Sequence, residues 1–328
     1  MHWLCKGRND MTTSVCMGLY NGAEYIEEQL YSILHQTKAP DEVILCDDGS
    51  TDDTVALVQH FIQANALEKH WKLYCNEKTK GYPGNFYYAC SLCTQEIVFL
   101  ADQDDIWEKH KIQHMCEVLE QQPQAKSVCC KFGLIDTNGA EIHTVMAPTH
   151  ASGTGQLRSI SVADVFYKCE WPGMVMAFRR AWYWQWIDQL CPGGAEKGFP
   201  GIPHDFCICA KAAEENGFLQ LDEELAFHRR HDHNAGGEEH RLKVLLNKQR
   251  KLEEVAKYLN ILTNFKSEFV LQTAEGKSAL ERKYCSMEAR HQALASGSML
   301  QVICAAHNYK DYVRPVTVIC DLLIVKRR

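Results

Sequence analysis

The sequence predicts an α/β fold in which one mixed, Rossmann-like sheet is flanked by helices and followed by a helical C-terminal extension. Strand-like and helix-like segments alternate through the first 130 residues, which is the pattern of parallel strands joined by helical crossovers. Two of the strand-like segments end directly in acidic clusters, at the edge where such sheets bind ligands. From Glu238 to about residue 297 the apolar pattern is helical, which predicts a separate helical region.

Four short apolar runs predict the parallel strands of the sheet. Each is about five residues long and is followed by polar or turn-forming residues, as buried strands are. The helix after the first run is the clearest, because four apolar residues from Ile26 to Leu34 recur on one helical face. The expected strands are 13–17, 42–46, 71–75 and 96–100, and the expected helices lie around 26–34, 55–62, 81–93 and 106–122.

The middle of the chain predicts two more strands, a long loop and one more helix. Segments 127–132 and 173–178 are rich in β-prone residues, and 191–203 is rich in Pro and Gly. The helix begins with His204-Asp205, which places the Asp205 carboxylate in its first turn. The positive end of the helix dipole then favours the ionised form of Asp205.

The C-terminal third differs from the rest in charge as well as in pattern. Residues 236–328 hold 16 Lys or Arg and 10 Asp or Glu, a balance of +6, whereas residues 1–235 hold 19 and 32, a balance of −13. We therefore expect a sheet-based domain at 11–235 and a basic helical region at 236–328, whose helical pattern breaks near Glu275-Gly276. Two interpretations of this region stay open: a charged face that covers the first domain, or peripheral contact with anionic lipid through Lys326-Arg327-Arg328.

Composition excludes several classes of protein. The chain has 328 residues, of which 46% are hydrophobic and 23% charged, as in a globular protein and unlike a disordered one. Its net charge of −7 argues against a nucleic-acid partner, because binding to phosphates needs positive charge. We find neither a secretory leader nor a run of the ~20 apolar residues that a membrane span needs. The expected location is therefore the cytoplasm, with membrane contact only at its periphery.

The 16 cysteines are expected to be reduced thiols in such a protein. Cys90 and Cys93 lie in a helical pattern that favours packing in the core. Cys207 and Cys209 are separated by one residue, a spacing that suits zinc poorly. We interpret both pairs as core cysteines and keep a structural zinc site as the alternative.

The cluster Asp102-Gln103-Asp104-Asp105 follows the fourth strand and predicts a cation site. Carboxylates that lie close together raise one another's pKa, and a divalent cation removes that conflict. In an extended segment Asp102 and Asp104 would point to the same side, and carboxylate oxygens suit Mg²⁺ or Mn²⁺. The alternative for this motif alone is a solvated loop with helix-capping aspartates.

An ordered set of motifs from Ser14 to about Asn234 resembles the family 2 glycosyltransferases of the GT-A fold, and within them the rhamnosyltransferase-like branch. The order and spacing match over roughly two-thirds of the chain, which makes the set specific although each motif alone is weak. The matching segments are Ser14–Gly22, Asp47-Asp48-Gly49-Ser50-Thr51-Asp52, Gly81 with Asn85-Phe86, Asp102–Trp107, His204-Asp205 and His228–Asn234.

The resemblance implies a nucleotide-sugar site at the ends of the first strands. Tyr20 and Asn21 are expected to border the nucleotide, and Asp48 to accept a hydrogen bond from N3–H of uracil or thymine. Gly81 and Asn85 are expected to line the base and ribose. The chain departs from the family pattern nearby, because Thr79-Lys80 replaces the usual Asn-Leu before Gly81.

The resemblance also implies which groups carry the chemistry. Asp102 is expected to face the ribose, Asp104 to bind the Mg²⁺ or Mn²⁺ that bridges the diphosphate, and His231 to complete that metal site. Asp205 is expected to act as the general base toward the acceptor hydroxyl. At His228 the family usually has Tyr, a change that concerns substrate identity.

Together these expectations describe an inverting, metal-dependent glycosyltransferase of the hexosyltransferase type. Its expected donor is a pyrimidine nucleotide-sugar, dTDP-rhamnose or a UDP-hexose. Its expected acceptor is a glycan or a lipid-linked acceptor in surface polysaccharide biosynthesis. The alternative is a catalytically silent protein of the same fold that binds nucleotide-sugars or glycans, against which the complete set of acidic residues argues. A P-loop or dinucleotide-binding enzyme is excluded, because no strand is followed by either glycine-rich motif.

Overall fold

A computed structural model describes residues 10–142, 155–168, 171–191, 193–194, 196–231, 247–308 and 315–326. The chain divides into two compact units. The first comprises residues up to Ile160 together with Glu170–Arg230, and the second comprises Ser161–Cys169 together with His231–Arg328. The boundary expected at residues 235–236 falls outside the described residues.

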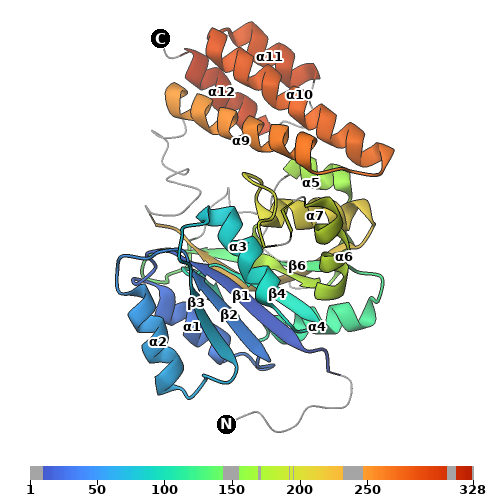
Figure 1. Cartoon of the computed structure of the whole chain (residues 1–328). Helices are drawn as coiled ribbons and strands as arrows, with labels where there is room; N and C mark the ends of the chain where they lie inside the picture. Colours follow the sequence, from blue (N-terminus) through green and yellow to red (C-terminus); the bar gives the residue numbers. More distant parts are fainter. Residues whose placement is uncertain are drawn as a thin grey trace. The chain divides into compact units, whose positions relative to one another are not determined.

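The first unit is built on one mixed sheet of nine strands (Figure 1). Strands β3, β2, β1 and β4 lie side by side in that order and are parallel, as the alternation of strands and helices predicts. Strand β8 then runs antiparallel between β4 and β6. The bounds are β1 Thr13–Leu19, β2 Glu42–Asp47, β3 Trp71–Cys75, β4 Ile97–Ala101, β5 Ile106–Trp107, β6 Ser127–Ile135, β7 Leu157–Ser159, β8 Met176–Arg179 and β9 Phe218–Arg229.

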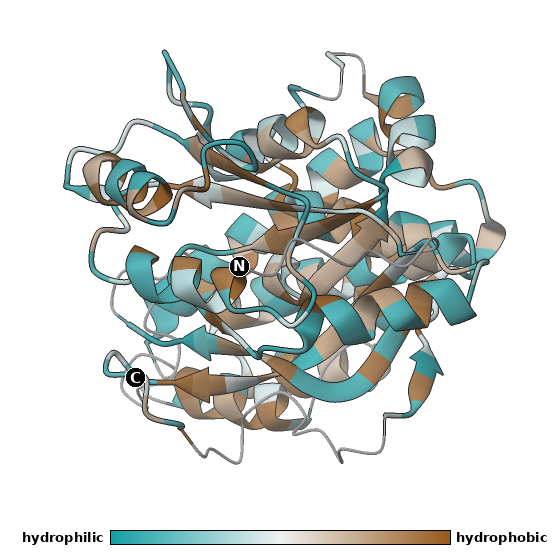
Figure 2. Ribbon diagram, turned by 90° about the horizontal axis from the view of Figure 1, so that it is seen from below, coloured by the Kyte–Doolittle hydropathy of each residue, from teal (hydrophilic) through white to brown (hydrophobic). Residues whose placement is uncertain are grey.

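Helices cover the sheet with their apolar faces, and Figure 2 shows hydrophobic strands at the centre with helices that are hydrophilic on one side. In α1 the predicted residues Ile26, Leu30 and Ile33 are the ones buried, which confirms the helical face read from their spacing. The helices of this unit are α1 Ile26–Leu34, α2 Thr54–Ala64, α3 Gly81–Leu92, α4 Lys111–Gln121, α6 Arg180–Leu190 and α7 His204–Glu214, with a 3₁₀ turn at Gly173–Val175.

Two predicted elements differ from the structure. The helix expected from residue 106 begins only at Lys111, because Ile106 and Trp107 pair with Phe227 and Ala226 as strand β5. The strand expected at 173–178 begins only at Met176, because its first residues form the 3₁₀ turn. At Ile106 and Trp107 a tertiary contact therefore overrides the local preference.

The cysteines lie mainly in the core as free thiols. Cys90, Cys93, Cys207 and Cys209 are all buried and unbridged. The sulfurs of Cys16 on β1 and Cys90 on α3 are 3.7 Å apart. Hydrogen bonding with Cys90 and Cys93, together with burial, raises the pKa of the Cys16 thiol. The packing of these thiols supports their interpretation as core residues.

The second unit is helical in its described parts. Its elements are α5 Val162–Lys168, α9 Lys248–Glu268, α10 Ala274–Ser296, α11 Met299–Asn308 and α12 Pro315–Lys326. The break expected at Glu275-Gly276 lies a few residues earlier, where the Thr273 hydroxyl caps α10 by accepting the Gly276 N–H at 3.0 Å. None of the helices described is both long enough and apolar enough to cross a bilayer.

Candidate active site

Loops from three neighbouring parallel strands meet at the carboxyl edge of the sheet. They follow β1, β2 and β4, whose registers place Leu19 beside Asp47 and Met17 beside Ala101. The first two loops are joined at their base, where the Asp48 N–H donates to the Leu19 carbonyl at 2.9 Å. This edge is where open α/β sheets bind ligands, and it carries most of the residues expected from the sequence to bind the nucleotide.

Asp48 is buried and holds the loop before α3 in place. Its Oδ1 accepts hydrogen bonds from the Asn76 amide at 2.8 Å and the Lys80 N–H at 2.7 Å, and its Oδ2 accepts the Gly81 N–H at 2.8 Å. Gly81 makes this contact with φ at +75°, a conformation that residues with a Cβ rarely adopt. Since a carboxylate has about four acceptor positions, one on Oδ2 is left for a ligand.

Asn85 lies behind Asp48 in the core. Its amide nitrogen donates to the Cys46 carbonyl at 2.7 Å, and its oxygen accepts from Asn76 at 2.9 Å. Asn76 therefore bridges Asn85 and Asp48 with one amide group. In this arrangement Asn85 supports the orientation of Asp48, and its expected direct contact with the base and ribose stays a prediction.

Tyr20 and Asn21 lie at the tip of the first loop. The exposed Tyr20 is held by its backbone, because the Gln103 amide accepts its N–H at 3.0 Å and donates to its carbonyl at 2.9 Å. Asn21 adopts φ of 46°, which Asn tolerates, and its Oδ1 accepts the Thr51 N–H at 2.8 Å. In the sequence, the position of Gln103 inside the acidic motif is the one signal of these two hydrogen bonds to Tyr20.

The acidic cluster forms a turn, which corrects the expectation of an extended segment. Residues 103 and 104 are turn residues between β4 and β5, so the two-residue periodicity does not orient Asp102 and Asp104. The carboxylates still act on one another. Burial raises the pKa of Asp102 well above its usual value, and the negative charges of Asp105, Asp104 and Asp205 raise it further.

Two buried cations lie beneath this turn. Lys111 donates to the Met174 carbonyl and stands 3.7 Å from the centre of the Trp107 ring. Burial lowers the pKa of Lys111 to about 8, although Cys130, Asp105 and Asp102 act in the opposite direction. Lys111 is therefore still predominantly protonated near neutral pH and lowers the pKa of Asp102.

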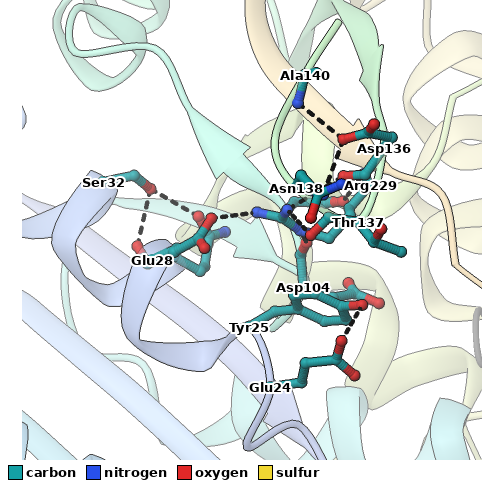
Figure 3. A network of polar contacts seen from close by, with 12 residues as sticks. Glu24, Tyr25, Glu28, Ser32, Asp104, Asp136, Thr137, Asn138, Ala140 and Arg229 are labelled. Atoms are coloured by element: carbon teal, nitrogen blue, oxygen red, sulfur yellow. Dashed lines mark hydrogen bonds and ion pairs between the residues drawn. The ribbon is translucent and has the colours of Figure 1, made fainter. Parts of the chain in front are cut away.

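The other cation, Arg229, ties the acidic turn to the rest of the first unit (Figure 3). Its Nε donates to the Asp104 carbonyl at 2.9 Å, and its terminal nitrogens reach the Asp136 and Thr137 carbonyls and the Glu28 carboxylate. The sequence motif contained Arg229, but nothing in its spacing indicated that a fully buried arginine fixes the backbone of Asp104.

The partly buried His228 pairs with the fully buried Asp105 beside this network. The His228 Nδ1 lies 2.9 Å from Asp105 Oδ1, which also accepts the Arg229 N–H at 3.0 Å. Burial lowers the pKa of His228, but the Asp105 carboxylate outweighs that effect and leaves the pKa raised. Asp105 Oδ2 is buried and accepts no hydrogen bond from the residues described.

The donor set of this turn fits a divalent cation. Asp102 and Asp104 supply carboxylate oxygens, the ligands preferred by Mg²⁺ and Mn²⁺. Among the residues described, no three His, Cys, Asp or Glu side chains form a complete metal cage. Mg²⁺ commonly takes only one or two protein carboxylates and completes its shell with substrate phosphates. These residues therefore fit a metal that enters together with a diphosphate.

Asp205 lies in the first turn of α7, as the sequence predicts. Its carboxylate accepts the Gly173 N–H at 3.1 Å and the Phe206 N–H at 2.7 Å. Burial nevertheless raises the pKa of Asp205 to about 6, against the lowering effect of these hydrogen bonds. The expectation that its helical position favours ionisation is thus outweighed, and the result is a carboxylate tuned closer to neutral pH.

Aromatic rings pack around His204, the residue before Asp205. The neighbouring His204 ring stacks on Phe86 with ring centres 4.1 Å apart and meets Tyr82 edge-on at 5.7 Å. Burial lowers the pKa of His204 to about 3, so this ring is neutral. Tyr82 itself is 46% exposed, so its ring is the solvent-facing member of this aromatic group.

His231 belongs to the second unit and begins the longer of its two segments. Its expected place beside Asp104 in the metal site therefore stays a prediction. The remaining residues of the motif after it, from Asp232 to Asn234, lie outside the described part of the chain.

Comparison with known proteins identifies the family. The model of "Glycosyl transferase family 2" matches residues 14–182. An uncharacterized glycosyltransferase of Nostoc sp. is 29% identical over 68% of this chain and 66% of its own length. A UDP-Glc:alpha-D-GlcNAc-diphosphoundecaprenol beta-1,3-glucosyltransferase of Escherichia coli is 32% identical over 32% of this chain and 40% of its own length. A dTDP-rhamnosyl transferase of Shigella flexneri is 35% identical over 31% of this chain and 36% of its own length.

Solved structures share the fold at low sequence identity. Staphylococcus aureus TarS in complex with UDP-GlcNAc is 17% identical, covers 96% of this chain and 89% of its own, and has a TM-score of 0.59. A mannosyltransferase of Pyrobaculum calidifontis in complex with GDP-Man and Mn²⁺ is 17% identical, covers 97% and 86%, and has a TM-score of 0.56. The predicted mixed sheet with flanking helices and a helical extension is thereby confirmed as a GT-A-like fold.

Proposed function

This chain belongs to glycosyl transferase family 2, and on that premise we propose that it is an inverting, metal-dependent transferase of a sugar from a pyrimidine nucleotide-sugar. The main observation behind the proposal is that two kinds of carboxylate occur together in the first unit. The acidic turn suits a metal–diphosphate, and the negative charge of Asp205 acts on it by raising the pKa of Asp102. The pKa of Asp205 is itself raised to about 6. The acidic turn would stabilise the diphosphate leaving group, and Asp205 would activate the attacking hydroxyl of the acceptor.

In the proposed reaction Asp205 accepts the proton of an acceptor hydroxyl. The oxygen forms a bond to the anomeric carbon of the donor sugar as the bond from that carbon to the diphosphate breaks. Attack from the side opposite the leaving group inverts the configuration. A pKa near 6 suits this role, because the carboxylate is ionised at neutral pH and is still a stronger base than an ordinary aspartate.

The chain's own residues would hold the leaving group. Asp104, with His231 as its proposed partner, would bind Mg²⁺ or Mn²⁺ together with the diphosphate, and Asp102 would face the ribose. A divalent cation bound there supplies Lewis-acid stabilisation of negative charge on the diphosphate. Arg229 keeps the Asp104 backbone in place through its carbonyl, so the metal-binding carboxylate is presented from a fixed turn.

The donor is proposed to carry uracil or thymine. Asp48 has one acceptor position left on Oδ2 after its three hydrogen bonds, which suits the single N3–H of either base. Relatives that use UDP-glucose and dTDP-rhamnose by name match the chain over about a third of its length. We therefore propose a UDP-hexose or dTDP-rhamnose as donor, consistent with the rhamnosyltransferase-like motifs.

The acceptor is proposed to be a lipid-linked or growing glycan of a surface polysaccharide. Support comes from the Escherichia coli relative, whose name specifies a diphosphoundecaprenol-linked sugar as its acceptor. Such an acceptor is embedded in a membrane, so we place the transfer at the cytoplasmic face of a membrane, with the protein bound at its periphery.

A nucleotide-sugar panel tests the proposal. The full chain is incubated with UDP-glucose, UDP-GlcNAc, dTDP-rhamnose or GDP-mannose, with Mn²⁺, Mg²⁺ or a chelator, and released nucleoside diphosphate is measured. We expect release from one pyrimidine donor, dependent on metal and lost in Asp104→Ala. Asp53→Ala is the matched control, because this exposed aspartate at the start of α2 makes no cap hydrogen bond.

Two outcomes contradict the proposal, and calorimetric titration with UDP and dTDP separates them. Binding of a nucleotide without release from any donor, even with glycosyl acceptors added, would favour the catalytically silent binding protein. Failure to bind either nucleotide in the presence of metal would refute the nucleotide-sugar site itself.

The pH dependence of transfer reports on Asp205. Because the base must be deprotonated to accept a proton, we expect kcat/KM to be constant above the pKa of Asp205, about 6. Below that value it should fall about tenfold per pH unit. The measurement is a profile from pH 5 to 8.5 at saturating metal, and a flat profile between pH 5 and 7 would remove Asp205 from the role of base.

A further inference from the structure

We propose that helices α11 and α12 bind the protein to an anionic lipid surface through their exposed apolar faces. Most apolar side chains of a folded chain are buried, whereas these two helices expose six large ones. On α11 they are Met299, Leu300 and Ile303, and on α12 they are Val316, Ile319 and Leu323. Leu300 is 70% exposed and Ile319 is 58% exposed.

The spacing of these residues makes two continuous faces. Leu300 and Ile303 are three residues apart on α11, and Val316, Ile319 and Leu323 follow one another at three and four residues on α12. Residues with these separations lie on one side of a helix. The opposite sides are packed, since Val302 of α11 and Ile324 of α12 are buried. In the structure described, each helix thus has one apolar side that is buried and another that is exposed.

The charge around these faces indicates which kind of partner binds to them. From Met299 to Arg328 the sequence holds five Lys or Arg and two Asp. One of those aspartates, Asp321, is only 2% exposed and forms a bidentate pair with Arg290 of α10 at 2.7 and 2.9 Å. The exposed sides of the two described helices therefore carry no acidic group, and Lys326 is exposed at the end of α12.

Apolar side chains without acidic neighbours, followed by a basic end, are the composition of a helix that lies in a membrane interface. Anionic lipid attracts the basic residues, and the apolar side chains enter the boundary between headgroups and acyl chains. The helices are 10 and 12 residues long, which suits lying on a bilayer rather than crossing it. A bilayer with a negative surface fits all three observations.

Vesicle co-sedimentation of the full chain tests the inference without donor or acceptor, so its failure is distinct from failure of the proposed transferase. The probes are vesicles of phosphatidylcholine alone and of phosphatidylcholine with 30% phosphatidylglycerol, a fraction chosen as roughly that of an anionic membrane surface. We expect binding to the second, weakened by salt, and about tenfold weaker in Leu300→Ser/Ile303→Ser and in Ile319→Ser/Leu323→Ser.

Val270→Ser is the matched control, because Val270 is an exposed apolar residue between α9 and α10 that belongs to neither face. It is expected to bind vesicles as the unaltered chain does, and circular dichroism checks that every variant is folded. Binding that is unchanged in both double variants overturns the inference, as does no binding to anionic vesicles. A dimer that both double variants dissociate would assign the faces to a second copy of the chain and would also overturn it.

Discussion

Replacing Asp205 with Asn is expected to lower the kcat of sugar transfer by roughly two to four orders of magnitude, while the affinity for the nucleotide-sugar stays unchanged. Asn is nearly isosteric and can still accept a hydrogen bond from Gly173 or Phe206, but it cannot take a proton from the acceptor. Steady-state kinetics with the donor identified in the panel, combined with calorimetric donor binding, separates the two effects. A loss of donor affinity equal to the loss of turnover would place Asp205 in the donor site instead.

The same substitution is expected to stabilise the protein. The pKa of Asp205 is about 6 in the folded chain and 3.8 without the fold, so folding disfavours its charge. This penalty is fully present above pH 6 and disappears below about pH 4, and it amounts to at most about 3 kcal/mol. Removing the charge while losing one of two hydrogen bonds, worth about 1 kcal/mol, leaves a gain of roughly 1–2 kcal/mol at pH 8.

Urea unfolding at pH 8 and pH 4 provides the control for this stability effect. The gain should be measurable at pH 8 and absent at pH 4, where the native carboxyl group is already protonated. A gain that is equal at both pH values would mean that the charge of Asp205 is not its cause.

Replacing Arg229 with Met is expected to cost about 3–5 kcal/mol of unfolding free energy. Met fills much of the same volume, but it cannot donate to the carbonyls of Asp104, Asp136 and Thr137, of which that of Asp136 keeps the Gly139 N–H as a second donor. It also loses the contact of the guanidinium with the Tyr25 ring, 4.7 Å from the ring centre. Urea denaturation monitored by tryptophan fluorescence measures the change.

Glu28→Gln is the matched control for Arg229→Met. Its side chain is 54% exposed whereas that of Arg229 is 0% exposed, so water can solvate Glu28 when the pair is broken. We expect a cost of no more than about 1 kcal/mol. Equal costs for the two variants would show that the ion pair, rather than the hydrogen bonds to the three carbonyls, accounts for the role of Arg229.

Several features follow from the sequence because they depend on neighbours along the chain. The apolar face of α1, the four parallel strands and the start of α7 at His204 all lie where the periodicity predicts them. The acidic motif follows β4 for the same reason, since the end of a buried strand is visible as the end of an apolar run. The family resemblance adds specificity, and the match over residues 14–182 confirms the family.

Other features were decided by residues far apart in the chain, and local pattern could not reveal them. Ile106 and Trp107 form a strand because Phe227 and Ala226 offer a partner more than a hundred residues later. Arg229 reaches Asp104 only after β9 has been placed in the sheet. The pKa of Asp205 depends on burial, which the packing of the whole unit determines and the position at a helix start does not.

Periodicity and motif spacing along the chain therefore predict the class of fold, the family and the set of carboxylates at one edge of the sheet. The packing of distant residues decides how those groups are held: which acceptor positions of Asp48 are occupied, which cation fixes the acidic turn, and why the pKa of Asp205 is higher than its helical position suggests. The physical reason is that periodicity and capping act over a few residues, whereas burial and electrostatics depend on everything that packs around a group.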